Sequence, residues 1–186
     1  CSRASYFEKS EWHHGVFRMK WADKHLGTPW LGKKEPGAGE DDFNDPQGLA
    51  VDKEGRLFVC DRGNDRVKIY SPDGKMLGQF SAPLPEQIAV HPLTGDIYVL
   101  SKTSDRVYDV MKSSDPVTSR ILKFSPWKGG ECKETARLEF LVKKHYAEMM
   151  ALDATASPPR LWVAISAGYG TQTAVTPITD EGAMLK

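Results

Sequence analysis

A unit of about 40 residues, made of short apolar segments separated by turns, recurs along this chain. In the clearest copy, turns fall at Lys53–Gly55, Arg62–Asn64 and Ser71–Gly74, and the first and last are hairpin turns in which glycine can supply a positive φ. Between these turns lie four apolar segments of strand length: 43–52, 55–61, 64–70 and 75–80. The pattern predicts a four-stranded antiparallel meander.

Further copies follow the first. Residues Pro85–His91 align with Pro46–Asp52, and Gly95–Ser101 align with Gly55–Asp61. The second copy continues in Thr118–Phe124 and Ala136–Val142 after an insertion at about 102–117, and a third opens with Glu148–Asp153 and Arg160–Ile165. Ahead of the first copy, Val16–Met19 and Gly27–Gly32 are predicted as the third and fourth strands of an earlier unit. Periods of about 40 residues with strand-like content are typical of β-propellers.

A single meander cannot bury both of its apolar faces, but meanders stacked around an axis can. We therefore expect an all-β fold, a partial β-propeller of four-stranded antiparallel blades, with two complete blades and two partial ones. The chain lacks an initial Met, and both ends fall inside repeat units, so we expect an excerpt of a longer protein that holds the remaining blades. The expected divisions are 1–42 (tail of a preceding blade and link), 43–82, 83–146 with its insertion, and 147–186 (start of a further blade).

The first copy carries a family signature. The pattern Pro46-x-Gly-Leu-Ala-Val-Asp52, Asp61, Asn64-Asp-Arg-Val67, Tyr70, Asp73-Gly74 and Phe80 resembles an NHL repeat over residues 44–80. The second copy departs from the pattern, with Gln87 in place of Gly48, and the third has Met149 there. The resemblance implies a propeller that usually has six blades, which needs about 240 to 300 residues. It also implies two kinds of relative: metal-dependent lyases or lactonases, and RNA-binding regulators.

Composition narrows these functions. Lys and Arg total 25 and Asp and Glu total 25, so overall charge gives no support to nucleic-acid binding. No apolar run reaches the ~18 residues of a membrane span, and the sequence contains no G-x-S-x-G or H-E-x-x-H motif. Three scattered cysteines do not form a disulfide framework. The compartment stays open, although Cys1 as a lipid-modified N-terminus would place the protein outside the cytoplasm.

One candidate site lies at the mouth of the central channel. Gln47, Glu86 and Glu148 occupy equivalent positions at the entry to the innermost strand of each unit. If they converge, their oxygens suit a hard cation such as Ca²⁺. The alternative is that each is a solvated loop residue without a metal.

A second candidate site is the loop rim on the same side. The insertion places Asp105, Arg106, Tyr108 and Asp109 there, and the loop 166–170 adds Tyr169. Long loops in compact domains are often functional, but a decorative hairpin fits equally well.

Asp61, Asn64 and Arg66 favour a structural role: Asp61 is expected to accept backbone N–H bonds across the turn at Arg62–Asn64 and Arg66 to pair with a carboxylate. His13 and His14 should face opposite ways, which argues against a shared metal, and His91 is predicted to lie exposed in a turn.

These observations favour a non-catalytic binding module or scaffold that engages a protein, peptide or glycan through the loop rim. A metal-dependent propeller enzyme of the lyase or lactonase type, with a divalent cation at the channel mouth, is the alternative. RNA binding is a third interpretation, which the neutral charge balance disfavours.

Overall fold

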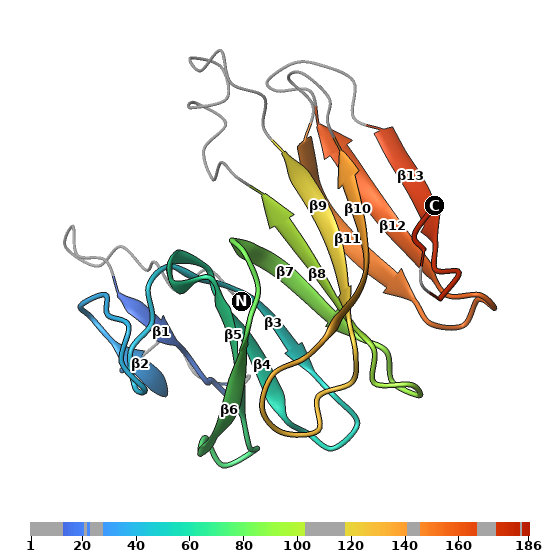
Figure 1. The fold of residues 1–186 in the computed structure, drawn as a ribbon. Helices are drawn as coiled ribbons and strands as arrows, with labels where there is room; N and C mark the ends of the chain where they lie inside the picture. Colours follow the sequence, from blue (N-terminus) through green and yellow to red (C-terminus); the bar gives the residue numbers. More distant parts are fainter. Residues whose placement is uncertain are drawn as a thin grey trace.

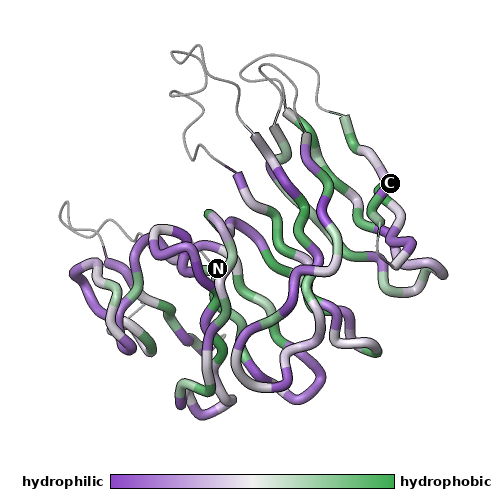
Figure 2. Tube along the Cα trace, viewed as in Figure 1, coloured by the Kyte–Doolittle hydropathy of each residue, from purple (hydrophilic) through white to green (hydrophobic). Residues whose placement is uncertain are grey.

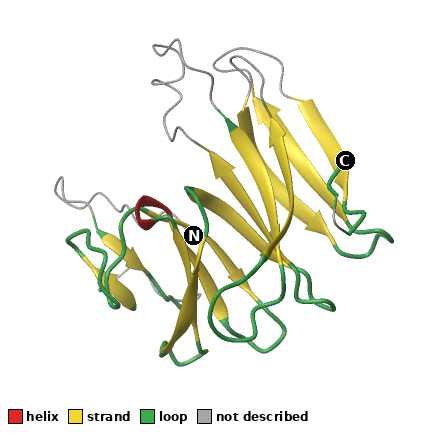
Figure 3. Cartoon of the chain, viewed as in Figure 1, coloured by secondary structure: helices red, strands yellow, loops and turns green. Residues whose placement is uncertain are grey.

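A computed structural model of the chain describes residues 13–20, 22, 28–102, 118–140, 146–166, 174–182 and 184–186. Almost all of the regular structure in this part is β-strand, with one short 3₁₀ helix, η1 (Arg62–Asn64) (Figure 3). The strands are β1 (His14–Val16), β2 (Leu31–Lys33), β3 (Pro46–Val51), β4 (Leu57–Asp61), β5 (Arg66–Tyr70), β6 (Met76–Ser81), β7 (Pro85–Val90), β8 (Ile97–Lys102), β9 (Ser119–Phe124), β10 (Glu134–Phe140), β11 (Tyr146–Asp153), β12 (Arg160–Ser166) and β13 (Ala174–Thr179).

The strands form four antiparallel sheets in chain order. Two are four-stranded, β3-β4-β5-β6 and β7-β8-β9-β10, one is three-stranded, β11-β12-β13, and one is the pair β1-β2. Figure 1 shows the sheets standing one after another in an open fan. In each of the three larger sheets every strand pairs with the strand before or after it in sequence. This is the partial propeller that the repeat predicts: two four-stranded blades flanked by smaller sheets.

The turns between the strands follow the sequence chemistry. Gly55 and Gly74 have φ of +77° and +91°, the left-handed region that a side chain resists. Asp52 Oδ1 accepts the backbone N–H of Glu54 at 3.0 Å and of Arg56 at 2.9 Å, which closes the β3–β4 turn. The prediction of an exposed His91 is wrong: the ring is 4% exposed, because it folds onto its own turn in the same manner as Asp52.

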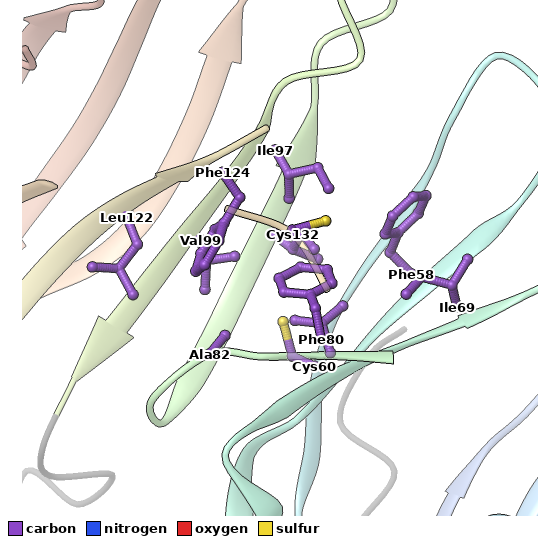
Figure 4. Close-up of a cluster of buried hydrophobic side chains, with 12 residues drawn as sticks. Phe58, Cys60, Ile69, Phe80, Ala82, Ile97, Val99, Leu122, Phe124 and Cys132 are labelled. Atoms are coloured by element: carbon purple, nitrogen blue, oxygen red, sulfur yellow. The ribbon is translucent and has the colours of Figure 1, made fainter. Parts of the chain in front are cut away.

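The first two blades pack face to face. Their shared core is drawn in Figure 4, and Figure 2 shows hydrophobic residues along the strands that face one another. All of its members are buried, because each sheet turns its apolar side chains to the other. The members are Phe58, Cys60, Val67, Ile69, Phe80, Ala82, Ile88, Ile97, Val99, Leu122, Phe124 and Cys132.

The second blade uses its other face against the third sheet. Tyr98, Leu100 and Ile121 pack there against Leu161 and Val163. Since successive side chains of a strand point to opposite faces, β8 has both faces covered and all of its residues are buried. Within the described residues one face of the third sheet is covered; on the other, Met149, Trp162 and Val175 are 63%, 40% and 64% exposed.

The N-terminal strands differ from the sequence prediction. Val16–Met19 was predicted as a strand, but β1 ends at Val16 because the hairpin to β2 begins there, with Trp30 N–H donating to Val16 O at 2.8 Å. β1 contacts the first strand of the next blade, β3, and the pair supplies Val16, Trp30 and Leu31 to a third core with Phe43 and Tyr70. Within the described residues, no helix has the length and apolar character needed to cross a membrane.

Candidate ligand-binding rim

One edge of the fan carries the segments that enter the first strand of each blade and those that join its second and third strands (Figure 1). The chain enters β3 through Asn44 and Asp45, enters β7 through Leu84, and joins β4 to β5 through η1. The insertion with Asp105, Arg106, Tyr108 and Asp109, and the loop with Tyr169, lie outside the described residues. Their ligand contacts therefore remain a prediction. The structure describes the residues at the base of the rim, which we call its floor.

That floor is a chain of alternating charges across two blades. Arg62 Nη1 lies 3.4 Å from Asp45 Oδ2, and Arg62 Nε lies 3.2 Å from Glu86 Oε2. The other Glu86 oxygen, Oε1, lies 2.8 Å from Lys102 Nζ. The side chains of Arg62, Lys102 and Glu86 are only 8%, 10% and 17% exposed, so water screens these pairs weakly. The cluster ties η1 of the first blade to β7 and β8 of the second.

The three residues proposed for a cation have different surroundings. Glu86 already faces two cationic side chains, and Gln47 donates its amide N–H to Asp45 Oδ1 at 2.5 Å. Glu148 accepts a bond from Gln87 through its backbone carbonyl, at 3.3 Å. In the part of the chain that the structure describes, no three His, Cys, Asp or Glu side chains gather in a way that could hold a metal ion. Calcium binding by Gln47, Glu86 and Glu148 stays a prediction.

Comparison with known proteins identifies the first blade. The family model described as "NHL repeat" matches residues 43–70. This segment is an NHL repeat. The chain is 41% identical over 49 residues to the E3 ubiquitin-protein ligase TRIM71 of Rattus norvegicus, 38% over 51 residues to Protein lin-41 of Caenorhabditis elegans, and 37% over 59 residues to NHL repeat-containing protein 3 of Homo sapiens.

These matches are local. They cover 26%, 27% and 31% of this chain but only 6%, 4% and 17% of the respective relatives. The solved structure of the Dos1 propeller is similar in fold over 95% of this chain and 46% of that one, with a TM-score of 0.53 at 13% identity. The chain thus combines an NHL repeat with the fold of part of a propeller.

The NHL signature residues form one buried network. Asp61 is fully buried; its Oδ2 accepts bonds from Arg66 Nε at 2.7 Å and Asn64 Nδ2 at 2.9 Å. Its Oδ1 accepts the backbone N–H of Asn44 at 2.7 Å. The expected bonds from Asp61 across the Arg62–Asn64 turn are wrong, since the side chain does not cap η1 and instead reaches the segment that enters β3. The pairing of Arg66 with a carboxylate is present.

The same network holds down the link that precedes the NHL repeat, residues 37–42, which we call the strap. Asn64 Nδ2 donates to Gly37 O at 2.8 Å, and Arg66 donates to the carbonyls of Ala38, Gly39 and Asp42 at 2.9 to 3.3 Å. Within the strap, Asp42 N–H donates to Gly39 O at 3.3 Å, and side chains from η1 and β5 supply further donors to the strap carbonyls.

Lys68, which sequence reasoning missed, anchors the strap. Its ammonium group donates to the carbonyls of Gly39 at 3.1 Å, Glu40 at 2.6 Å and Asp42 at 2.7 Å, and lies 4.7 Å from the centre of the Phe43 ring. The residue is fully buried, and burial lowers the pKa of its amine to about 8. In the sequence, a Lys between Val67 and Ile69 indicates a strand whose lysine side faces solvent. The Gly-rich composition of 37–39 was the only signal that a strap lies over this side.

Proposed function

We propose that this chain is a non-catalytic binding module whose NHL propeller fold presents a protein or peptide ligand site on the loop rim. The observation that carries the proposal is the pairing of Glu86 with Arg62 and Lys102 at the base of that rim. This pairing joins two blades and neutralises the carboxylate that an alternative metal site would need. The insertion leaves the fold directly after Lys102, so it starts from a fixed base.

Fixed bases under variable loops are the common design of binding surfaces, because the loops can change while the sheets keep packing. Asp45 beside Arg62 and Glu86 beside Lys102 neutralise these basic side chains at the base of the rim, which makes a phosphate backbone a poor ligand there. Ubiquitin ligation, which the name of the rat relative states for that protein, is not proposed here, since the match covers 6% of it.

The test uses a random peptide library displayed on phage, selected against the chain and followed by calorimetry with the enriched peptides. Replacing Asp105, Arg106, Tyr108 and Asp109 together with alanine, or Tyr169 alone, should weaken binding by about tenfold or more if they include anchor residues. Lys53→Ala and Lys75→Ala, exposed positions in turns of the opposite edge, are the matched controls and should leave affinity unchanged. Equal binding by the rim variants and the wild type would reject the rim as the site.

A second experiment distinguishes the binding module from a metal-dependent enzyme. Stoichiometric Ca²⁺ or Zn²⁺ in the purified protein, together with loss of that metal in a Glu86→Gln/Glu148→Gln variant, would favour the alternative. Peptide binding that is unaffected by EDTA and only weakly dependent on salt would favour the module, whereas a steep salt dependence would point to a polyanion such as RNA.

A further inference from the structure

The turn between the first and second strands is closed in the same way in all three larger sheets. In the first, Asp52 Oδ1 accepts the N–H groups of Glu54 and Arg56. In the third, Asp153 Oδ1 accepts those of Thr155 at 3.0 Å and Ala156 at 3.3 Å. The hydrogen bonds from Thr155 lower the pKa of the Asp153 carboxyl below its usual value, so this acceptor stays ionised near neutrality.

The second blade replaces this carboxylate with an imidazole. His91 Nδ1 accepts the backbone N–H of Leu93 and of Thr94, both at 3.2 Å. An imidazole nitrogen accepts a hydrogen bond only through its free lone pair, so Nδ1 is unprotonated here and the ring proton sits on Nε2. Protonation of Nδ1 would convert the acceptor into a donor that faces two other donors.

We propose that His91 is a pH-sensitive cap, which holds the β7–β8 turn closed when neutral and releases Pro92–Thr94 when it becomes protonated. The imidazole loses its acceptor at Nδ1 when one proton binds there, whereas each carboxylate of the other two turns has two acceptor oxygens, so the His91 cap is the one that a single proton can open. The released segment carries Leu93, which is 78% exposed and is the most exposed large apolar side chain of the described residues.

The surroundings of the ring allow the change. His91 lines a small cavity of about 30 Å³, room for about one water molecule beside the ring. From the β3–β4 turn, Asp52, Lys53, Glu54 and Arg56 line the same cavity, and their charges balance. The β9–β10 loop contributes the uncharged Pro126 and Trp127, and the remaining charged neighbour on the ring's own turn is Asp96, which faces Lys123 at 3.5 Å.

Two bonds hold the rest of the turn independently of the ring. His91 N–H donates to Asp96 O at 2.8 Å, and Gly95 N–H donates to His91 O at 2.9 Å. Release is therefore confined to the tip, and β7 and β8 keep their pairing. Protonation of His91 therefore changes the surface around Leu93, on the edge opposite the ligand rim, and leaves the core intact.

The experiment is an NMR titration of this chain from pH 8 to pH 5. Carbon and nitrogen shifts of the His91 ring report its protonation, and backbone carbon shifts of Pro92–Thr94 report the turn. Both sets should move together, and the exchange protection of the Leu93 and Thr94 amides should fall by about tenfold, the loss expected for a broken hydrogen bond. The amides of Glu54, Arg56, Thr155 and Ala156 are internal controls and should show no such change.

His91→Asp supplies the matched variant, because it restores the cap that the other two turns use. Its turn should stay closed across the whole range, with no step in protection. Ring protonation in the wild type without any change in the turn would overturn the proposal, as would an imidazole that stays neutral down to pH 5. An identical response in His91→Asp would also overturn it, and the wild-type titration decides the matter even if that variant fails to fold.

Discussion

Gly48 provides the most direct test of how the blades pack. A Cβ atom at this position would lie 2.7 Å from Gln87 Cα and 2.8 Å from Glu86 O, both backbone atoms of the next blade. The φ of Gly48 is not in the left-handed region, so alanine meets no strain from its own backbone. The whole cost of Gly48→Ala therefore comes from pushing β3 and β7 apart.

The size of that cost follows from the contact. Overpacking a close interface costs about 1 to 3 kcal/mol, and a clash with backbone, which cannot rotate away, belongs at the upper end. Replacing a glycine also stabilises by about 0.4 to 1 kcal/mol through the unfolded chain. A net loss of about 2 kcal/mol corresponds to a fall in Tm of about 4 to 8 °C for a chain of this size.

Thermal and urea unfolding, followed by circular dichroism, measure this loss. Gly78→Ala is the comparator: its Cβ would meet only the tip of the Trp127 ring, at 3.0 Å, and that side chain can shift. Its Tm should stay within about 2 °C of the wild type. If Gly48→Ala is as stable as Gly78→Ala, β3 and β7 do not approach each other as described, and the argument for direct blade contact fails.

Two further predictions concern buried charges. Lys68→Met should lower the free energy of unfolding by about 2 to 4 kcal/mol in urea, because three strap carbonyls lose their donor, whereas Lys75→Met on an exposed turn should be neutral. Asp180 is buried, which raises its pKa, but Lys123 at 2.8 Å, Tyr98 and the Gly182 N–H outweigh this and lower it below the usual 3.8. The stability from this group is therefore complete above about pH 4 and is lost as pH falls through the folded pKa. Urea unfolding from pH 6 to 2.5 should show that the free energy of unfolding falls less steeply with acid in Asp180→Asn than in the wild type. Equal pH slopes of the free energy in the two proteins would contradict the assignment.

The strands were predictable because their signals are local. Alternating apolar residues and turn glycines such as Gly55 and Gly74 depend only on neighbouring residues, and the pairing of β3 to β6 follows from short connections. The shared core of the first two blades was also predictable, since a meander with two apolar faces needs a partner on each. What local signals establish is which face a residue occupies.

They do not establish what lies over that face. Asp61 binds Asn44, 17 positions earlier, and Lys68 binds carbonyls 26 to 29 positions earlier. Lys68 alternates with Val67 and Ile69 along β5, and a lysine at such a position is ordinarily solvated, but the strap crosses this side of the strand. His91 was misjudged for a related reason: the aligned Asp52 suggested an exposed turn, while the ring packs between two blades.

One repeat position shows how the blades adjust their spacing. Gly48 in the first blade lets the backbone of β7 approach directly. At the equivalent place in the second blade, the Gln87 amide bridges a wider gap: Nε2 donates to Glu148 O at 3.3 Å, and Oε1 accepts the Met150 N–H at 2.7 Å. The departure from the NHL pattern thus preserves the contact between neighbouring first strands by other means.

The third sheet has Met149 at this position, and its side chain is 63% exposed. It lies in register with Ala164 and Val175, next to the row that contains Trp162, so the exposed residues form one apolar face across three strands. In the two preceding sheets, this same position contacts the backbone of the following sheet. Met149 thus stands, on an exposed apolar face, at the position that makes the contact between sheets in both preceding blades.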